Sequence, residues 1–319
     1  MRKRNCLIAA ASLVLIGCLA FVGVMTALGW DFSRLSTARY ETNCYELEES
    51  FSSVSIVGNT ADIVFLPSED LTCSVECYEQ ENVKHAVSVK EGKLVIEVED
   101  TRKWYQHISI GFRSPKITVY MPQGAYASLT VKESTGDMEI PSDFQFESID
   151  LSASTGDIVC LASATGLIKI KTTTGEITLK GLSAGELDLS VTTGDVTVSD
   201  VTCVGDAAIS VSTGKAEMSD VTCRSLRSEG DTGDILLRNV IATEGISVTR
   251  DTGDVTFDGC DAADIFVETD TGDVEGSLLS DKVFVTQTDT GSVHVPSSAA
   301  GGRCEITTDT GDIRISIQS

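Results

Sequence analysis

Carboxylates recur at fixed positions beside a Thr-Gly pair that is repeated through the last two-thirds of this chain. The residue after the glycine is acidic in eight of ten copies, and the residue two places before it is Asp in the last five. Rows of hard oxygen ligands are able to bind Ca²⁺, although exposed aspartates are also commonplace in turns. The repeat lacks the glycine-rich nonapeptide of calcium-binding β-rolls, so we favour solvated turn acids over a metal site. The calcium candidates, ranked second, are Asp231, Asp234, Asp251, Asp254, Asp270, Asp273, Asp309 and Asp312.

The last five copies read Asp-Thr-Gly, which is also the catalytic tripeptide of aspartic proteases. Such a protease brings two of these loops together from two lobes, so that two carboxyls share one proton. Copies that follow one another on adjacent rungs of a repeat are unable to meet in that way. We therefore assign no catalytic residue to them.

Ten cysteines are scattered along the chain without a paired Cys-x-x-Cys zinc pattern. Cys203 and Cys223 each end a copy of Ser-Asp-Val-Thr-Cys, twenty residues apart, which predicts that they stack on neighbouring rungs within reach of a disulfide. An inward-facing cysteine is equally an ordinary small hydrophobe, so both interpretations stay open. Cys73 and Cys77, four residues apart on a strand-like segment, are a weaker candidate pair.

The sequence offers little for catalysis. The three histidines, His85, His107 and His294, lie near no Ser or Cys nucleophile in sequence. Carbohydrate-active β-helix enzymes are the alternative, but they carry long loops that build a cleft, and this array has almost no insertion longer than a turn. We expect a protein that is not an enzyme and needs no cofactor, with Ca²⁺ as the one candidate ion.

The elements that position these residues follow from the spacing of the Thr-Gly pairs. Successive glycines are 19 or 20 residues apart, and so regular a period indicates one supersecondary unit copied and stacked. The sequence therefore predicts a repeat array over residues 126–319. Its turn glycines are Gly136, Gly156, Gly175, Gly194, Gly214, Gly233, Gly253, Gly272, Gly291 and Gly311.

Apolar columns on either side of each glycine predict the secondary structure. Positions two and four after the glycine, and five and seven before it, are mostly aliphatic with polar residues between them, which is typical of half-buried strands. The two strands are out of phase by one residue, so a bend at Thr-Gly must restore the inward phase. Threonine precedes all ten glycines and predicts a threonine ladder.

These patterns predict an all-β fold, a parallel right-handed β-solenoid of about ten coils. At about 4.8 Å per coil the rod would be about 50 Å long. A β-sandwich is the main rival, but it does not explain identical turn chemistry in every repeat.

The first thirty residues predict a membrane anchor. Residues 1–5 are basic, and residues 6–30 form an apolar run without charge, which is long enough to span a bilayer. The basic tail should stay in the cytoplasm and the remaining chain should be exported, which places the protein in a bacterial cell membrane with a single pass. A cleaved signal peptide is one alternative. Lipidation of Cys18 is the other, because Leu15-Ile16-Gly17-Cys18 resembles a bacterial lipobox.

We expect a polar stalk over residues 31–48 and a β region over residues 49–125 that caps the first coil. The cap should contain a hairpin over residues 86–98 and a strand over residues 116–121, before Pro122. A basic-aromatic cluster, Arg102 to Tyr105 with His107 and Arg113, is either a solvated loop or a contact for lipid head groups or glycans. At the other end, the strand at Ile313–Ile317 should leave an open sheet edge, or one that its short length protects.

The net charge of −24 argues against binding to nucleic acid, whose phosphates the chain would repel. The repeated Thr-Gly-Asp turn, the strand Tyr120-Met121-Pro122 and the N-terminal anchor resemble a bacterial family of adhesin-like, β-strand-repeat proteins of unknown function. The resemblance covers roughly residues 48–319 and implies a β-solenoid outside the membrane, without catalytic residues. Three functions remain: a surface module that binds an envelope protein or glycan, an envelope scaffold or stress sensor that assembles through the open end, and the less favoured enzyme. The oligomeric state is left open.

Overall fold

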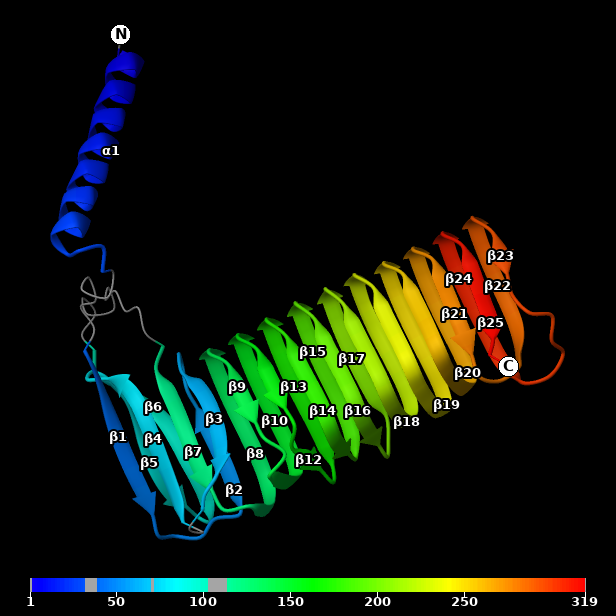
Figure 1. The fold of residues 1–319 in the computed structure, drawn as a ribbon, viewed down its shortest axis with the longest axis horizontal. Coiled ribbons are helices and arrows are strands. Elements are labelled where there is room, and N and C mark those ends of the chain that lie inside the picture. Colours follow the sequence, from blue (N-terminus) through cyan, green and yellow to red (C-terminus); the bar gives the residue numbers. More distant parts are fainter. Residues whose placement is uncertain (1, 32–38, 70–71, 103–113, 319) are drawn as a thin grey trace.

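In the computed structural model, which describes residues 2–31, 39–69, 72–102 and 114–318, one helix is followed by a rod of stacked β-strands (Figure 1). The helix α1 (Arg2–Ala27) contains the window Ala10–Ala27, whose mean hydropathy is 2.3 and of which 6% is buried. It is long and apolar enough to cross a membrane. The described residues after it form strands and the turns and loops between them, so the fold is the all-β solenoid that the repeat predicts.

Two parallel stacks of strands form the first half of the array. One stack pairs β8, β10, β13, β15 and β17 in register, and the other pairs β9, β11, β14 and β16. Their bounds are β8 (Gly124–Thr135), β9 (Met138–Ile140), β10 (Phe144–Thr155), β11 (Ile158–Cys160), β12 (Ser163–Ala164), β13 (Leu167–Thr174), β14 (Ile177–Ala184), β15 (Glu186–Thr193), β16 (Val196–Cys203) and β17 (Ala207–Thr213).

In the second half of the array, the three strands β18, β19 and β20 are longer and continue around a bend from one stack into the other, and shorter strands follow them. Their bounds are β18 (Ala216–Thr232), β19 (Ile235–Thr252), β20 (Val255–Thr271), β21 (Val274–Leu278), β22 (Lys282–Thr290), β23 (Val293–His294), β24 (Gly302–Thr310) and β25 (Ile313–Ile317). Nine of the ten residues two places after the turn glycines are buried, and the exception, Val293, is 40% exposed. The predicted inward-facing column two places after the glycine is therefore confirmed, and the exposure of Val293 marks an end of the rod.

Each coil bends at a second corner that the sequence analysis missed. Six places after the turn glycine, five successive coils carry a residue with φ between 49° and 64°. This is the left-handed region, which Gly, Asn and Asp enter most easily. The residues there are Gly181, Asp200, Asp220, Asn239 and Gly259, so the signal was present in the residue types.

The last two coils are not stacked in chain order. Strand β24 pairs with β20 on one side and β22 on the other, and β25 lies between β21 and β23 in the same way. In Figure 1 the red C-terminal strands accordingly lie inside the orange ones. The prediction that Ile313–Ile317 forms the open edge is wrong for Ile313 and Arg314, which pair with β23, whereas the described Ile315–Ile317 pairs with β21 alone. Among the described strands, β22 and β23 form that end of the rod.

The crossover that makes this order possible is fixed by a nearly buried ion pair. The chain leaves β21 at Leu278 and passes over one coil before β22 begins at Lys282. The Nζ atom of Lys282, whose side chain is 4% exposed, lies 2.7 Å from Asp261 Oδ1, and Ser280 Oγ donates to the same oxygen at 2.7 Å. Leu278 lies opposite Cys260 and is buried, whereas Leu279 is 44% exposed, because β21 has one residue fewer than β20 between Gly276 and Leu278.

At the N-terminal end, too, one coil is stacked out of chain order. Strands β2 (Ser53–Val57) and β3 (Asp62–Pro67) form a coil that lies between β6–β7 and β8–β9. Its corner, Thr60-Ala61-Asp62, is a degenerate copy of Thr-Gly-Asp, and Thr60 pairs with Thr135. The solenoid therefore begins within the segment 49–125 that was expected only to cap it.

Antiparallel strands complete that end. Strand β4 (Cys73–Gln80) pairs with β1 (Tyr40–Leu47) and with β7 (Lys116–Met121), and the hairpin of β5 (Val83–Lys90) and β6 (Lys93–Asp100) confirms the predicted one. Because β1 is a paired strand, the prediction of a stalk over residues 31–48 is wrong for Tyr40–Leu47. Most of the basic-aromatic cluster, Lys103, Trp104, Tyr105, His107 and Arg113, lies outside the described residues.

Candidate binding face

The Thr-Gly corner is a packed backbone contact. All ten turn glycines have φ between 132° and 159°. A Cβ placed on any of them would lie 1.9–2.2 Å from a carbonyl oxygen at the same corner of the adjacent coil. Glycine is therefore required twice, for the backbone conformation and for the close approach. The threonines before these glycines pair in register and are exposed, which confirms the predicted ladder.

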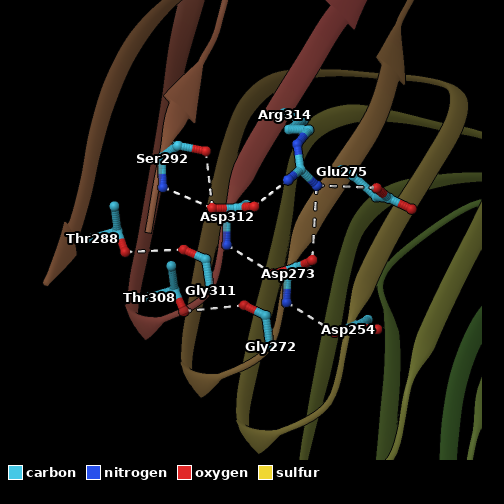
Figure 2. Close-up of polar contacts among 10 residues, drawn as sticks. All are labelled: Asp254, Gly272, Asp273, Glu275, Thr288, Ser292, Thr308, Gly311, Asp312 and Arg314. Carbon is cyan, nitrogen blue, oxygen red and sulfur yellow. Dashed lines mark hydrogen bonds and ion pairs between the residues drawn. The ribbon is translucent and has the colours of Figure 1, made fainter. Parts of the chain in front are cut away.

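A further inward column lies three places before the turn glycine, and sequence reasoning missed it. The hydroxyl of the buried Thr308 donates to Gly272 O at 3.1 Å, and the hydroxyl of the partly buried Thr288 donates to Gly311 O at 3.0 Å (Figure 2). Thr172 and Thr269 make the same contact with Gly156 and Gly253. Because the column mixes Thr with aliphatic residues, it does not stand out by hydrophobicity.

Two charged side chains enter the same column, each opposite a glycine. Glu133 is 6% exposed, its Oε1 accepts from Ala61 N at 3.2 Å, and a Cβ on Gly58 would lie 1.8 Å from its Oε2. Burial raises the pKa of Glu133 to about 7, against the lowering effect of the backbone amides. Arg250, 1% exposed, donates to Val211 O at 2.7 Å, and burial lowers its pKa.

Seven of the eight acidic residues that follow a turn glycine accept a backbone amide from the adjacent coil. The amide of Asp273 donates to Asp254 Oδ1 at 2.8 Å, the amide of Asp312 donates to Asp273 Oδ1 at 2.8 Å, and the amide of Ser292 donates to Asp312 Oδ1 at 2.7 Å (Figure 2). The bonds from Ser292 hold the pKa of Asp312 below its usual range. Corresponding bonds join Asp62 to Asp137, Asp137 to Asp157, Asp157 to Glu176, Asp195 to Lys215 and Asp234 to Asp254.

This ladder separates the two columns of calcium candidates. Asp234, Asp254, Asp273 and Asp312 each accept a backbone amide from the adjacent coil. Their partners in the other column are exposed. Within the described part of the chain, no three of the candidates bring carboxylate oxygens within 4.8 Å of one another. The structure gives the first column a structural role and assembles no shared ligand set. The exposed column consists of Asp231, Asp251, Asp270, Asp289 and Asp309.

The cysteine candidates are buried and unbridged in this structure. Cys203 and Cys223 occupy the same position in neighbouring coils, as their spacing predicts, and both thiols are free. The Sγ atom of Cys203 lies 3.5 Å from the carbonyl oxygens of Gly205 and Asp206. Both residues fit the role of small inward side chains. Cys73 and Cys77 are likewise buried and free.

A groove of about 370 Å³ lies on the outer face of β18, β19, β20 and β24. It begins where β19 holds one more residue than its neighbours, between Ala242 and Gly245. Gly245 and Ser247 are small, and the larger side chains of Arg227 and Phe266 flank Ser247 in register on the adjacent coils. A bulge and a glycine thus open a hollow in an otherwise regular face.

The groove combines an aromatic ring with paired charges. Phe266 is 36% exposed, while Ile246 and Ile265 beneath it are buried. Arg227 pairs with Glu229, and Arg303 Nη2 lies 2.8 Å from Glu305 Oε2. Volumes of this size, with an apolar floor and a few polar groups, are typical of small-ligand sites. Sequence reasoning missed the groove because its residues belong to four coils that carry no shared motif.

The sequence model of one protein family matches residues 51–212 and 204–319 of this chain. The chain belongs to the Toastrack DUF4097 family. The match begins at the first β-coil and covers the whole solenoid, so the family domain includes β2 and β3 as well as the Thr-Gly-Asp array. No curated protein matches the chain.

Several solved structures of bacterial proteins match the chain. A putative lipid binding protein from Parabacteroides distasonis is 13% identical with a TM-score of 0.44, and the match covers 88% of this chain and 98% of that one. A putative adhesin from Bacteroides fragilis is 15% identical with a TM-score of 0.34 over 87% and 97% of the two chains. A second putative adhesin from Parabacteroides distasonis is 10% identical with a TM-score of 0.43 over 85% and 98%. At these identities and scores the likeness carries no argument about ligand.

Proposed function

We propose that this chain is a membrane-anchored, non-enzymatic binding module that holds a neutral glycan in the groove over β18, β19, β20 and β24. The observation that carries the proposal is the exposed ring of Phe266 above an apolar floor, in a hollow whose Arg and acidic side chains balance. Arg227, Asp264, Arg303 and Glu305 sum to zero formal charge in a chain of net charge −24. An uncharged ligand with apolar and hydrogen-bonding surfaces suits such a site.

The length of the groove fits a short oligosaccharide. It crosses four coils, and three inter-strand steps of about 4.8 Å give about 14 Å. The polar groups on its rim are the Ser225 and Ser247 hydroxyls with the Asp264 and Glu305 carboxylates. These groups are suited to accept and donate hydrogen bonds to sugar hydroxyls, while the ring of Phe266 packs against a sugar face.

The N-terminal helix suggests where the rod lies relative to the membrane. We infer that α1 spans a bacterial cell membrane once, with the basic residues 1–5 in the cytoplasm and the rod outside. The rod would then present its groove to the envelope or the exterior. Lipidation at Cys18 stays an alternative form of the same anchoring.

The test is a glycan array probed with the full chain in detergent micelles, followed by calorimetric titration of the best binder. Phe266→Ala should weaken binding at least tenfold, because it removes the aromatic surface. Leu167→Ala is the matched control, since Leu167 is 37% exposed, similar to Phe266, and lies outside the groove. Equal affinities for the two variants would overturn the proposal.

The scaffold alternative now depends on a different strand. If the rod assembles through an open edge, that edge is mainly β22, which pairs with β24 on one side, whereas β25 pairs with β21 along its length and with β23 at Ile313 and Arg314. Val283 and Val285 on β22 are 37% and 45% exposed. Light scattering after size exclusion decides between the two: a monomer at all concentrations excludes the scaffold and leaves the binding module.

A further inference from the structure

Cys77, Glu79 and His85 form a buried cluster in the N-terminal strands, outside the groove. Cys77 and Glu79 are two residues apart on β4 and so share a face, and His85 follows on β5. The Sγ, carboxylate oxygen and ring nitrogen of these residues lie within 4.8 Å of one another. Cys77 and Glu79 are fully buried, and His85 is 4% exposed. Three different metal-binding groups thus meet in one small volume.

The carboxylate at the centre is held in place from three directions. Glu79 Oε2 accepts from His85 N at 2.7 Å and lies 2.7 Å from His85 Nδ1. Its other oxygen, Oε1, accepts from Asn43 Nδ2 on β1 at 2.7 Å. Such outer contacts orient metal ligands in known sites. The cluster therefore joins β1, β4 and β5, the strands that close the N-terminal end of the rod.

The thiol supplies the softest of the three donors. No hydrogen bond to Cys77 Sγ is found among the described residues, whereas Cys160, Cys203 and Cys260 donate to carbonyl oxygens. Burial, and then the nearby charge of Glu79, raise the pKa of Cys77 to about 12. The thiol keeps its proton unless a cation replaces it.

We propose that Cys77, Glu79 and His85 bind one Zn²⁺ ion. Sulfur, imidazole nitrogen and carboxylate oxygen together suit Zn²⁺, whereas Ca²⁺ and Mg²⁺ take oxygen ligands. Zinc bonds to these donors are about 2.0–2.3 Å long, which requires donor atoms about 3–4 Å apart. Small side-chain shifts from the present separations are enough. A water molecule would complete the fourth position.

The charges also balance. Binding releases the proton of the Cys77 thiol, and His85 binds as the neutral imidazole with the lone pair of one ring nitrogen facing the ion. The thiolate and the Glu79 carboxylate then offset the 2+ charge, and the loaded cluster is neutral. Neutrality matters because an unpaired charge in this interior is expensive. The ion would fasten the three strands that follow the membrane anchor in sequence.

The test titrates the reduced full chain, in detergent micelles, with Co²⁺ and then Zn²⁺. We expect one equivalent of Co²⁺, a thiolate charge-transfer band in the near ultraviolet, and its loss when Zn²⁺ is added. Cys77→Ser should abolish the band, while Cys73→Ser should keep it, because Cys73 is a buried cysteine on the same strand and outside the cluster.

A second variant covers the case in which Cys77→Ser fails to fold. His85→Gln keeps the backbone amide that donates a hydrogen bond to Glu79. This variant should weaken Co²⁺ binding at least about 100-fold. An unchanged Co²⁺ affinity in His85→Gln, or a band that persists in Cys77→Ser, overturns the proposal. Absence of the band from the unmodified chain does so too, and leaves an ordinary buried Glu–His pair.

Discussion

The substitution Glu133→Gln should remove a pH dependence from the stability of the rod. Glu133 is buried between the first two coils, and its pKa is raised from 4.5 to about 7. Because its pKa is higher in the folded state, the folded chain binds more protons between these values, and the free energy of unfolding falls as pH rises through this range. Each pKa unit corresponds to about 1.4 kcal/mol, so the loss by pH 8 is about 3 kcal/mol.

The assay is urea unfolding of the full chain in detergent micelles, followed by the strand circular dichroism signal between pH 5 and pH 8. Glu133→Gln should be more stable than the unmodified chain by about 3 kcal/mol at pH 8, and the difference should shrink towards pH 5. Glu139→Gln is the control, because it removes the same charge from an exposed position on β9. A difference between Glu133→Gln and the unmodified chain that is the same at both pH values would refute the reasoning.

Three further predictions test the packing of the coils. Gly253→Ala should destabilise the rod by about 3 kcal/mol or more, since its Cβ would lie 2.2 Å from Gly233 O, whereas Gly124→Ala, with no atom within 4 Å, should be nearly neutral in the same urea assay. Lys282→Met should cost about 2 kcal/mol at pH 7. Burial alone would raise the pKa of Asp261, but the bonds from Lys282 and Ser280 keep that pKa below its usual value. The stability difference between Lys282→Met and the unmodified chain should therefore vanish in acid, as Asp261 protonates. Deletion of residues 302–318 should abolish amide protection from hydrogen exchange in β22, which pairs with β24; protection retained there would contradict the coil order.

The Thr-Gly period predicted the solenoid because backbone stacking imposes the same demand on every coil. Each glycine must admit the carbonyl oxygen of its neighbour, so the residue type repeats wherever the contact repeats. The inward columns follow for the same reason. The second corner was also readable, from Gly181, Asp200 and Asn239, because few residue types enter the left-handed region easily.

The order of the last coils left a fainter signal. The carboxylate of Asp312, which follows Gly311, accepts from the amide and the hydroxyl of Ser292, so Asp312 supports a coil beyond it. Ser292 has no carboxylate to support a further coil, as suits the terminal coil, but Lys215 replaces the acid at the same place inside the array. Chain order usually matches stacking order, which is why the open edge was assigned to Ile313–Ile317.

The groove and the Cys77 cluster could not be predicted from the sequence, for a different reason. Arg227, Phe266 and Arg303 come from separate coils and meet through register, which depends on where β19 gains its extra residue. Cys77 and His85 meet only because β4 and β5 turn back on each other, with Asn43 brought in from β1. Neither set has a spacing that distinguishes it from ordinary strand residues.

The most direct test of the binding module is hydrogen exchange of the full chain with and without the best glycan from the array. We expect slower exchange over the four segments that line the groove, residues 225–227, 245–247, 264–266 and 303–305. Protection confined to the exposed Thr-Gly corners, or to the edge strand β22, would contradict it.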